Sequence, residues 1–187
     1  MRYIIGLLIA IGLIVLVIVL IFKAFAGHKI VSQPLVNFAY SPTIMQLTVD
    51  GPINADQNHL SFQISVGQYD SEFRAYKGYQ GTITNQATYP SNPVAYANFL
   101  RALDVAGYTK GNQTSENSDE RGFCPFGQRY IFEITTNGHD TQRDWATSCG
   151  QGTFGGKLST TLNLFSAQIP DFTKLNQGLN FSSSIRF

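Results

Sequence analysis

Residues 129–148 read RYIFEITTNGHDTQRDWATS, two runs rich in β-branched, aromatic and hydroxyl side chains around a central Asn-Gly pair. Asn-Gly between two strand-like runs is a strong signal for a two-residue β-hairpin turn. We therefore predict a hairpin with Asn137 and Gly138 at its tip. This register places Tyr130 opposite Trp145, a favourable aromatic cross-strand pair.

The two cysteines of the chain, Cys124 and Cys149, flank this hairpin. In the predicted register they come to lie near one another at its open end, where Pro125 and Gly127 let the chain bend. A bridge would close a loop of about 25 residues, worth roughly 3 kcal/mol in the chain-entropy model. We predict a Cys124–Cys149 disulfide and hence an oxidising compartment, with two free thiols in a cytosolic domain as the alternative.

Upstream of the hairpin we expect four more strands, at 44–49, 60–66, 72–77 and 80–85. The clearest, 60–66, reads LSFQISV and alternates apolar with polar residues, as an antiparallel strand with one buried face does. A helix begins at Asn92-Pro93 and ends at Gly107, and a second is expected over about 159–168. This order predicts an α+β domain: an antiparallel sheet of about six strands with two helices on one face. The tail 176–187 is either a last edge strand or irregular.

The run Tyr3–Phe22 reads YIIGLLIAIGLIVLVIVLIF and contains no charged side chain. As a helix rising about 1.5 Å per residue it would span about 30 Å, the thickness of the hydrocarbon core of a bilayer. We therefore expect 1–27 to be a transmembrane signal anchor, 28–42 a linker and 43–187 the folded, disulfide-stapled domain outside the cytoplasm. Cleavage after Ala26, in an A-x-A pattern, is one alternative. A type IV pilin-like stem is another.

Charge argues against nucleic acid as a partner. The chain has 187 residues, with 13 Lys and Arg against 12 Asp and Glu. Arg2, Lys23 and Lys29 precede residue 43, which leaves the domain with 10 cations against 12 anions. A net negative domain does not favour binding to a phosphate backbone.

Two motifs resemble cofactor or metal sites but lack essential parts. Residues 150–155, GQGTFG, match the G-x-G-x-x-G pattern of dinucleotide sites, yet no convincing parallel strand follows the next helix. Asn54, Asp56 and Asn58 have the spacing of a calcium loop without its glycine and bidentate glutamate. The three histidines are far apart and fit no metal spacing. We therefore expect neither a cofactor nor a metal ion.

Aromatic side chains with a polar tip are good contact residues for proteins and sugars. Five tyrosines gather in or beside the predicted turns and strand ends: Tyr69, Tyr76, Tyr79, Tyr89 and Tyr108. We expect them to form a binding surface for another envelope or surface protein or for a glycan. Partial burial against the sheet is the alternative interpretation.

The sequence therefore predicts a single-pass protein of the cell membrane whose C-terminal domain is a non-catalytic binding or envelope-assembly module. No nucleophile-elbow, zinc-protease or Ser-x-x-Lys pattern is present. An extracytoplasmic hydrolase is the first alternative, and it would draw on Glu133 and Asp144, which share a face of the predicted hairpin. A pilin-like surface subunit is the second. The expected anchor makes the lipid bilayer itself a partner, through Tyr3–Phe22.

Overall fold

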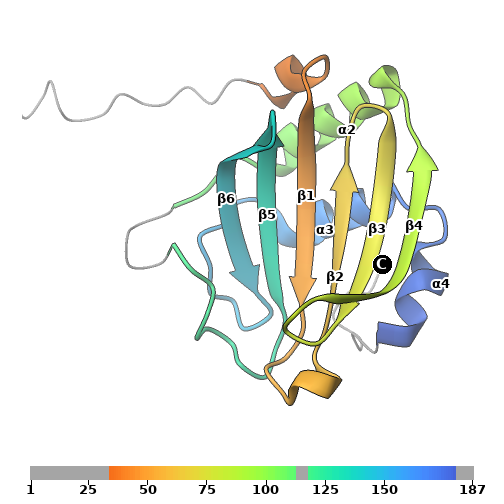
Figure 1. The fold of residues 1–187 in the computed structure, drawn as a ribbon. Coiled ribbons are helices and arrows are strands. Elements are labelled where there is room, and N and C mark those ends of the chain that lie inside the picture. Colours follow the sequence, from red (N-terminus) through yellow and green to blue (C-terminus); the bar gives the residue numbers. More distant parts are fainter. Residues whose placement is uncertain (1–33, 113–117, 180–187) are drawn as a thin grey trace, which may run out of the picture. The chain divides into compact units, whose positions relative to one another are not determined.

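A computed structural model describes residues 34–112 and 118–179 of the chain. In this part six antiparallel strands form one sheet in the order β4-β3-β2-β1-β5-β6 (Figure 1). The strands are β1 (Thr43–Asp50), β2 (Leu60–Val66), β3 (Asp70–Lys77), β4 (Thr82–Pro90), β5 (Arg129–Thr136) and β6 (His139–Thr147). The predicted α+β class and six-stranded antiparallel sheet are confirmed.

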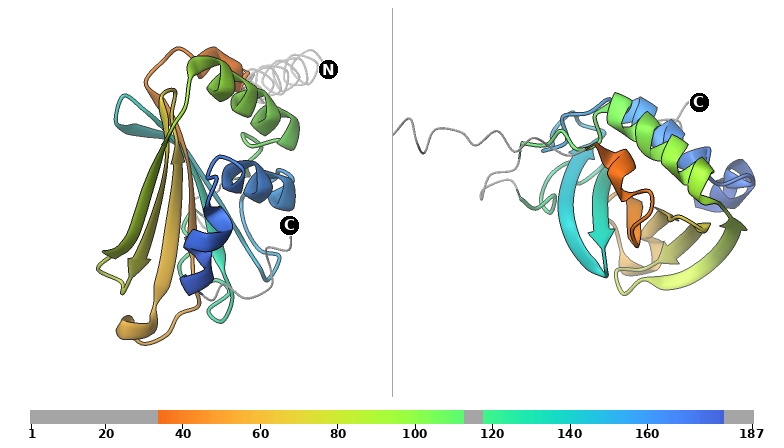
Figure 2. Two further views of the ribbon diagram at one scale, coloured as in Figure 1. Left: turned by 90° about the vertical axis from the view of Figure 1, so that its right-hand side faces the viewer. Right: turned by 90° about the horizontal axis from the view of Figure 1, so that it is seen from above.

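The helices lie on one face of the sheet, as both views of Figure 2 show. They are α2 (Pro93–Ala106), α3 (Leu158–Ser166) and the short α4 (Phe172–Asn176), with 3-10 turns η1 (Leu35–Phe38), η2 (Asp56–Asn58) and η3 (Gln177–Leu179). Asn92 caps α2 because its side-chain oxygen accepts hydrogen bonds from the amides of Val94 and Ala95, at 3.1 and 3.0 Å. Gly107 ends the helix in the left-handed conformation that glycine tolerates best.

The core lies between the sheet and these helices. Alternate side chains of the central strands point toward the helices and are buried, among them Leu47, Phe62 and Phe132. Phe99 of α2 and Phe165 of α3 meet edge to face over them, with ring centroids 5.3 Å apart. Burial of such side chains, at about 25 cal/mol per Å² of apolar surface, is the main stabilising contribution.

The folded domain begins at Pro34. Leu35 and Ala39 are fully buried, and the amide of Leu35 donates to the carboxylate of Asp104 on α2 across 2.8 Å. Residues 34–42, which the sequence assigned to the linker, therefore belong to the domain. The predicted anchor over Tyr3–Phe22 lies outside the described residues. Among the residues that the structure does describe, no helix is long and apolar enough to cross a membrane.

The predicted turn between β5 and β6 is present. Asn137 and Gly138 have φ angles of 53° and 78°, and Thr136 pairs with His139 on either side of them. Two positive φ angles at the turn are what an Asn-Gly hairpin requires.

The hairpin register, however, shifts by one residue just beyond the turn. Thr135 pairs with Asp140 but Ile134 pairs with Gln142, so Thr141 is an extra residue in β6. Its hydroxyl donates to the carbonyl of Ile134 across 3.0 Å. Because of this extra residue, each side chain of β6 after Thr141 lies on the face opposite to the one that an unbroken register would give it.

The predicted pairing of Tyr130 with Trp145 is therefore wrong. Trp145 lies opposite Ile131, and Tyr130 lies opposite Ala146. Tyr130 and Trp145 consequently point to opposite faces of the sheet. Trp145 is buried on the face away from the helices, where the ring of Phe123 packs on it at 4.9 Å.

Candidate binding surface

The predicted disulfide is confirmed. Cys124 and Cys149 are bonded, with their Cα atoms 5.8 Å apart. They close the loop 124–128, in which the amide of Gly127 donates to the carbonyl of Cys124. A Cβ at Gly127 would lie 2.4 Å from the sulfur of Cys124 and 2.3 Å from the hydroxyl of Ser148, so the tight bend requires glycine. The disulfide and the tight bend at Gly127 thus constrain the loop.

This loop lies at the distal end of the sheet, which we define by the loop 51–59, the β3–β4 turn 78–81 and the loop 124–128. The strand registers place these three segments at one end, whereas Pro42 and the β2–β3 turn 67–69 lie at the other (Figure 1). The amide of Ile53 donates to the carbonyl of Pro125 across 2.8 Å. Two of the distal loops are therefore joined directly.

An ion-pair network fixes the base of the loop 51–59. Nε2 of His59 lies 2.8 Å from one carboxylate oxygen of Asp50, and the guanidinium of Arg129 lies 2.6 Å from the other. His59 and Arg129 are both buried. Arg129 also donates to the carbonyl of Gly51 across 2.8 Å. The ion pair of Arg129 with Asp50 is held firmly in place, since separating it would leave the buried guanidinium without its carboxylate.

Tyr79, in the β3–β4 turn, joins the third segment to this network. Its ring stacks on the imidazole of His59, with centroids 4.0 Å apart and an interplanar angle of 15°. Its hydroxyl bonds both the amide and the carbonyl of Asn54, and its amide donates to the carboxylate of Asp56 across 2.7 Å. The three distal segments are therefore connected into one unit.

Three large apolar side chains of this unit are exposed, and we call Ile53, Tyr79 and Phe126 the tip patch. Their exposed fractions are 45%, 53% and 91%. Their segments are joined, because the amide of Ile53 donates to the carbonyl of Pro125, next to Phe126, and the hydroxyl of Tyr79 bonds Asn54, next to Ile53. Exposed apolar side chains on a rigid scaffold are typical of interaction sites.

The five tyrosines predicted to form a binding surface are not brought together. Tyr79 belongs to the tip patch, but Tyr69 is exposed in the β2–β3 turn at the opposite end of β3. Tyr76 pairs with Ser61 on the face without helices. Tyr89 points to the helix side, where its hydroxyl donates to Asp171 across 3.2 Å. Four of the five therefore lie in four separate environments.

The fifth, Tyr108, is a core residue and not a surface residue. Its side chain is 1% exposed, and its hydroxyl donates to the carbonyls of Gln46 and Glu133, at 2.9 and 3.0 Å. Its ring packs against that of Phe132 at 5.8 Å. The prediction that Tyr108 lies at the surface is wrong. Tyr108 follows directly after Gly107, and the chain reversal there turns its ring into the core between the sheet and the helices. Burial raises the pKa of its phenol well above the usual value.

The other two members of the tip patch, Ile53 and Phe126, were not predicted. Both stand inside turn-forming sequences, Gly51-Pro52-Ile53-Asn54 and Cys124-Pro125-Phe126-Gly127. Turn residues lie at the surface, so a large apolar side chain between them has little chance of burial. That pattern was the signal available in the sequence.

The acid–base pair proposed for a hydrolase is contradicted. Glu133 lies on the face away from the helices, where it accepts hydrogen bonds from Gln46 and Arg143. Asp144 pairs with Phe132, on the helix side, and its carboxylate accepts from Thr153 at 3.1 Å. The bulge at Thr141 separates the two carboxylates onto opposite faces. They cannot act on one substrate.

Four cavities lined by described residues contain no other carboxylate pair. Their volumes are about 420, 400, 330 and 240 Å³. Each has at most one carboxylate in its wall: Asp70 in the third and Asp144 in the fourth. Within residues 34–112 and 118–179, no group of three His, Cys, Asp or Glu side chains could hold a metal ion.

The G-x-G-x-x-G segment uses its own amides within the fold. The amides of Thr153 and Phe154 both donate to the carbonyl of Trp145, and that of Gly155 donates to Lys110. A phosphate site at such a segment depends on amides that are free to donate to the ligand. Its function here is to pack against β6, where Gly152 bridges to Ala146.

Comparison with known proteins adds no family to these observations. No protein-family model matches the chain, and a search of curated proteins found no match.

Proposed function

We propose that this chain is a membrane-anchored, extracytoplasmic binding module that performs no catalysis. In this proposal Tyr3–Phe22 crosses the membrane once, and the domain that begins at Pro34 lies outside the cytoplasm. Its partner is another protein of the envelope or cell surface, or a glycan. The observation that carries the proposal is the tip patch, in which Phe126 is almost fully exposed on a loop closed by a disulfide.

The rigidity of the tip patch supports binding. Association is weakened by the entropy lost when mobile loops become ordered, and a loop that is already fixed avoids most of this loss. Burying a Phe side chain against a partner contributes about 1.5–3 kcal/mol. Tyr79 adds a ring that is held by His59 and Asn54 before any partner arrives.

The position of the tip patch supports accessibility. The chain enters the domain at Pro34, close to the start of β1, and the tip patch lies at the other end of that strand. The tip patch therefore lies at the end of the domain opposite to the one at which the chain enters it.

The binding surface can be tested by photo-crosslinking in the cells that produce the protein. The photoreactive residue p-benzoylphenylalanine replaces Phe126 in one variant and Val105 in the control. Val105 is 79% exposed on α2 and lies outside the tip patch. We expect a discrete crosslinked product at position 126 and none at 105. Equal crosslinked products at positions 126 and 105 would contradict the proposal. So would the absence of any product at 126, if binding of envelope polysaccharide also proves independent of Phe126.

The anchor needs a separate test. Intact mass spectrometry of the protein from isolated membranes distinguishes the full chain from a product cleaved after Ala26. We expect the full-length mass, less two hydrogens for the disulfide, and flotation of the protein with lipid vesicles. A mass beginning at Gly27 would support secretion in place of anchoring, and processing near Gly6 would support the pilin-like alternative.

A further inference from the structure

The edge formed by β4 is open. β4 is the last strand of the sheet, and in the described part of the chain no strand pairs with its second edge. Its nine residues read TITNQATYP and carry no charge, and seven of them are exposed. Natural proteins usually protect an edge strand with charged side chains, bulges or a covering segment, because its free peptide groups can pair with another chain. β4 has one register shift, which makes Thr84 an extra residue, but the stretch 85–89 beyond it pairs regularly with β3.

The opposite edge, formed by β6, is covered over residues 145–147. The amide of Thr147 donates to the carbonyl of Gln151, and the amides of Thr153 and Phe154 donate to Trp145, all at 2.8–2.9 Å. Residues 151–154 therefore occupy the peptide groups that β6 would otherwise present at Trp145 and Thr147. The left view of Figure 2 faces the β4 side of the sheet, where α4 lies beside the strand and on the helix side of it. The fold protects one edge and leaves the other available.

The hydrogen bonding of β4 shows which of its peptide groups are free. The amide of Ser91 donates to the carbonyl of Tyr69 across 2.7 Å, in register with the β3–β4 ladder. Along an antiparallel ladder, every second residue forms hydrogen bonds with the partner strand. Counting back from Ser91, these residues of β4 are Tyr89 and Ala87, whose peptide groups point toward β3. The amides and carbonyls of Gln86 and Thr88 therefore point away from the sheet.

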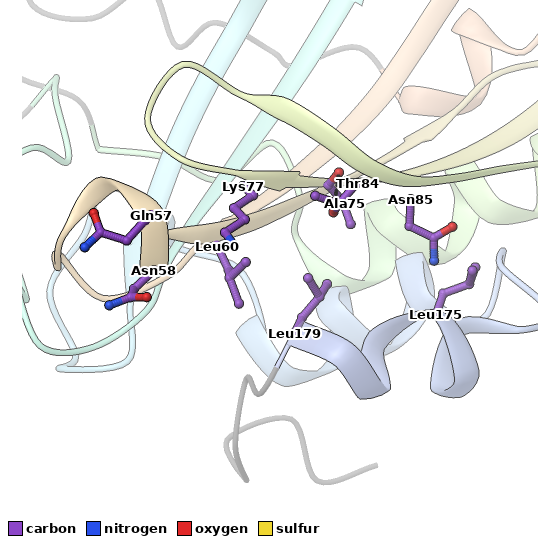
Figure 3. A pocket seen from close by; sticks show the side chains of 9 residues that line it. All are labelled: Gln57, Asn58, Leu60, Ala75, Lys77, Thr84, Asn85, Leu175 and Leu179. Atoms are coloured by element: carbon purple, nitrogen blue, oxygen red, sulfur yellow. Dashed lines mark hydrogen bonds between the residues drawn. The ribbon is translucent and has the colours of Figure 1, made fainter.

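A groove of about 420 Å³ adjoins this edge on the helix side. Figure 3 shows side chains from the strands and from the α4–η3 segment pointing toward one another across it. Its apolar lining comes from Leu60, Ala75, Leu175 and Leu179, and Thr84 and Asn85 of β4 form its rim. Of the described residues that line it, Lys77 alone is charged.

We propose that the β4 edge binds an extended segment of another polypeptide, which adds to the sheet as a further strand. Its backbone pairs with the peptide groups of Gln86 and Thr88. Alternate side chains of an added strand point to one face, so an apolar side chain enters the groove and a neighbouring carboxylate meets Lys77. This inference does not depend on the tip patch.

Charge favours a separate acidic segment over the other occupants. A second copy of β4 is uncharged and brings no partner for Lys77. Residues 180–187, which follow the groove residue Leu179, carry Arg186 as their one charged side chain, and it has the same sign as Lys77. An acidic segment of another protein complements the groove.

The probe is a phage-displayed library of random dodecapeptides, selected on the full-length protein in lipid nanodiscs. We expect enriched peptides that alternate apolar and polar residues and contain Asp or Glu. An enriched peptide, synthesised with a fluorophore, then gives dissociation constants by anisotropy. Thr88→Pro removes an outward amide and should weaken binding by about tenfold, while Thr88→Val keeps the amide and should stay within about twofold.

The charge contact has its own matched pair. Lys77→Glu should weaken binding by about tenfold, and Lys157→Glu, at an exposed site before α3, should leave it unchanged. Both lysines are exposed, so these two variants still test peptide binding if Thr88→Pro fails to fold. Failure to enrich any peptide, or equal affinity for the wild type and Lys77→Glu, would overturn the proposal.

Amide exchange in the peptide-free protein tests for the other occupants. We expect the amides of Gln86 and Thr88 to exchange quickly and those of Ala87 and Tyr89 slowly, as measured by NMR. Slow exchange at all four would mean that the edge is already paired, and the inference would then be wrong. Deletion of 180–187, or dilution, would show whether the chain's own tail or a second copy pairs there.

Discussion

The amide of Ile53 donates to the carbonyl of Pro125, 2.8 Å away, and this single bond joins the two loops that carry most of the tip patch. One loop is closed by the Cys124–Cys149 disulfide, and the other is tied to Asp50 through His59. Each loop therefore limits the motion of the other. Changes made in one loop should therefore be measurable in its neighbour.

Removing the disulfide should destabilise the whole domain. For a sequence separation of 25 residues, the double variant Cys124→Ser/Cys149→Ser should lose about 3 kcal/mol of unfolding free energy. Because the loops are joined, the amide of Ile53 should also exchange faster in this variant. Chemical denaturation and NMR exchange measure the two effects. Unchanged exchange at Ile53 would show that the loops move independently.

Two substitutions at His59 separate its stacking on Tyr79 from its contact with Asp50. His59→Phe keeps a ring against Tyr79 but loses the contact with Asp50, whereas His59→Ala loses both. We expect a loss of about 1 kcal/mol for the Phe variant and about 2–4 kcal/mol for the Ala variant, which also leaves a cavity. Thermal unfolding of both proteins gives the comparison. Equal losses would mean that the ring of Tyr79 gains nothing from His59.

Tyr108→Phe should cost stability although it removes only one oxygen. The hydroxyl of Tyr108 donates to the carbonyls of Gln46 on β1 and Glu133 on β5, and the side chain is 1% exposed. Loss of a buried donor should reduce the unfolding free energy by about 1–3 kcal/mol. The exposed Tyr69→Phe is the control and should change it by less than about 0.5 kcal/mol.

Asp104 should give the domain a pH-dependent contribution. Burial raises the pKa of this carboxyl above its ordinary 3.8, partly offset by hydrogen bonds from the amides of Leu35 and Val36. The folded state then holds the proton more tightly than the unfolded state. The contribution of Asp104 to the stability of the fold is therefore largest below pH 3.8, and it is lost as the pH rises through the pKa of the folded state.

Urea unfolding at a series of pH values can test this contribution. The difference in unfolding free energy between the wild type and Asp104→Asn should change over the interval just above pH 3.8 and be constant at neutral pH. Asp70→Asn, at an exposed position, serves as the control. A difference that is the same at every pH would contradict a raised pKa.

The parts of the fold that follow from local chemistry could be predicted from the sequence. The alternation in 60–66, the cap at Asn92 and the Asn137-Gly138 turn each depend on neighbouring residues alone, and each is found in the structure. The disulfide also followed, because its two cysteines flank a single hairpin. Local signals of this kind agree with the global fold wherever tertiary contacts do not override them.

The features that depend on tertiary contacts could not be predicted. Nothing near Thr141 marks it as a bulge, yet it sets the faces of Trp145 and Asp144. The burial of Leu35 depends on α2, about seventy residues away, which supplies Asp104 as its partner. The tip patch combines three loops whose proximity is fixed only by the sheet. A surface predicted from residue type alone therefore included the buried Tyr108 and missed Phe126.

The asymmetry between the two sheet edges also limits how copies of this domain can assemble. A sheet that is open at both edges can add strands without end, as in a growing fibre. Here residues 151–154 occupy the outward peptide groups of β6 at Trp145 and Thr147, so two molecules that met through β4 would expose outer edges that are covered over this part. This cover opposes further strand addition at β6. The protein thereby keeps an uncharged edge available at β4 while reducing its tendency to polymerise.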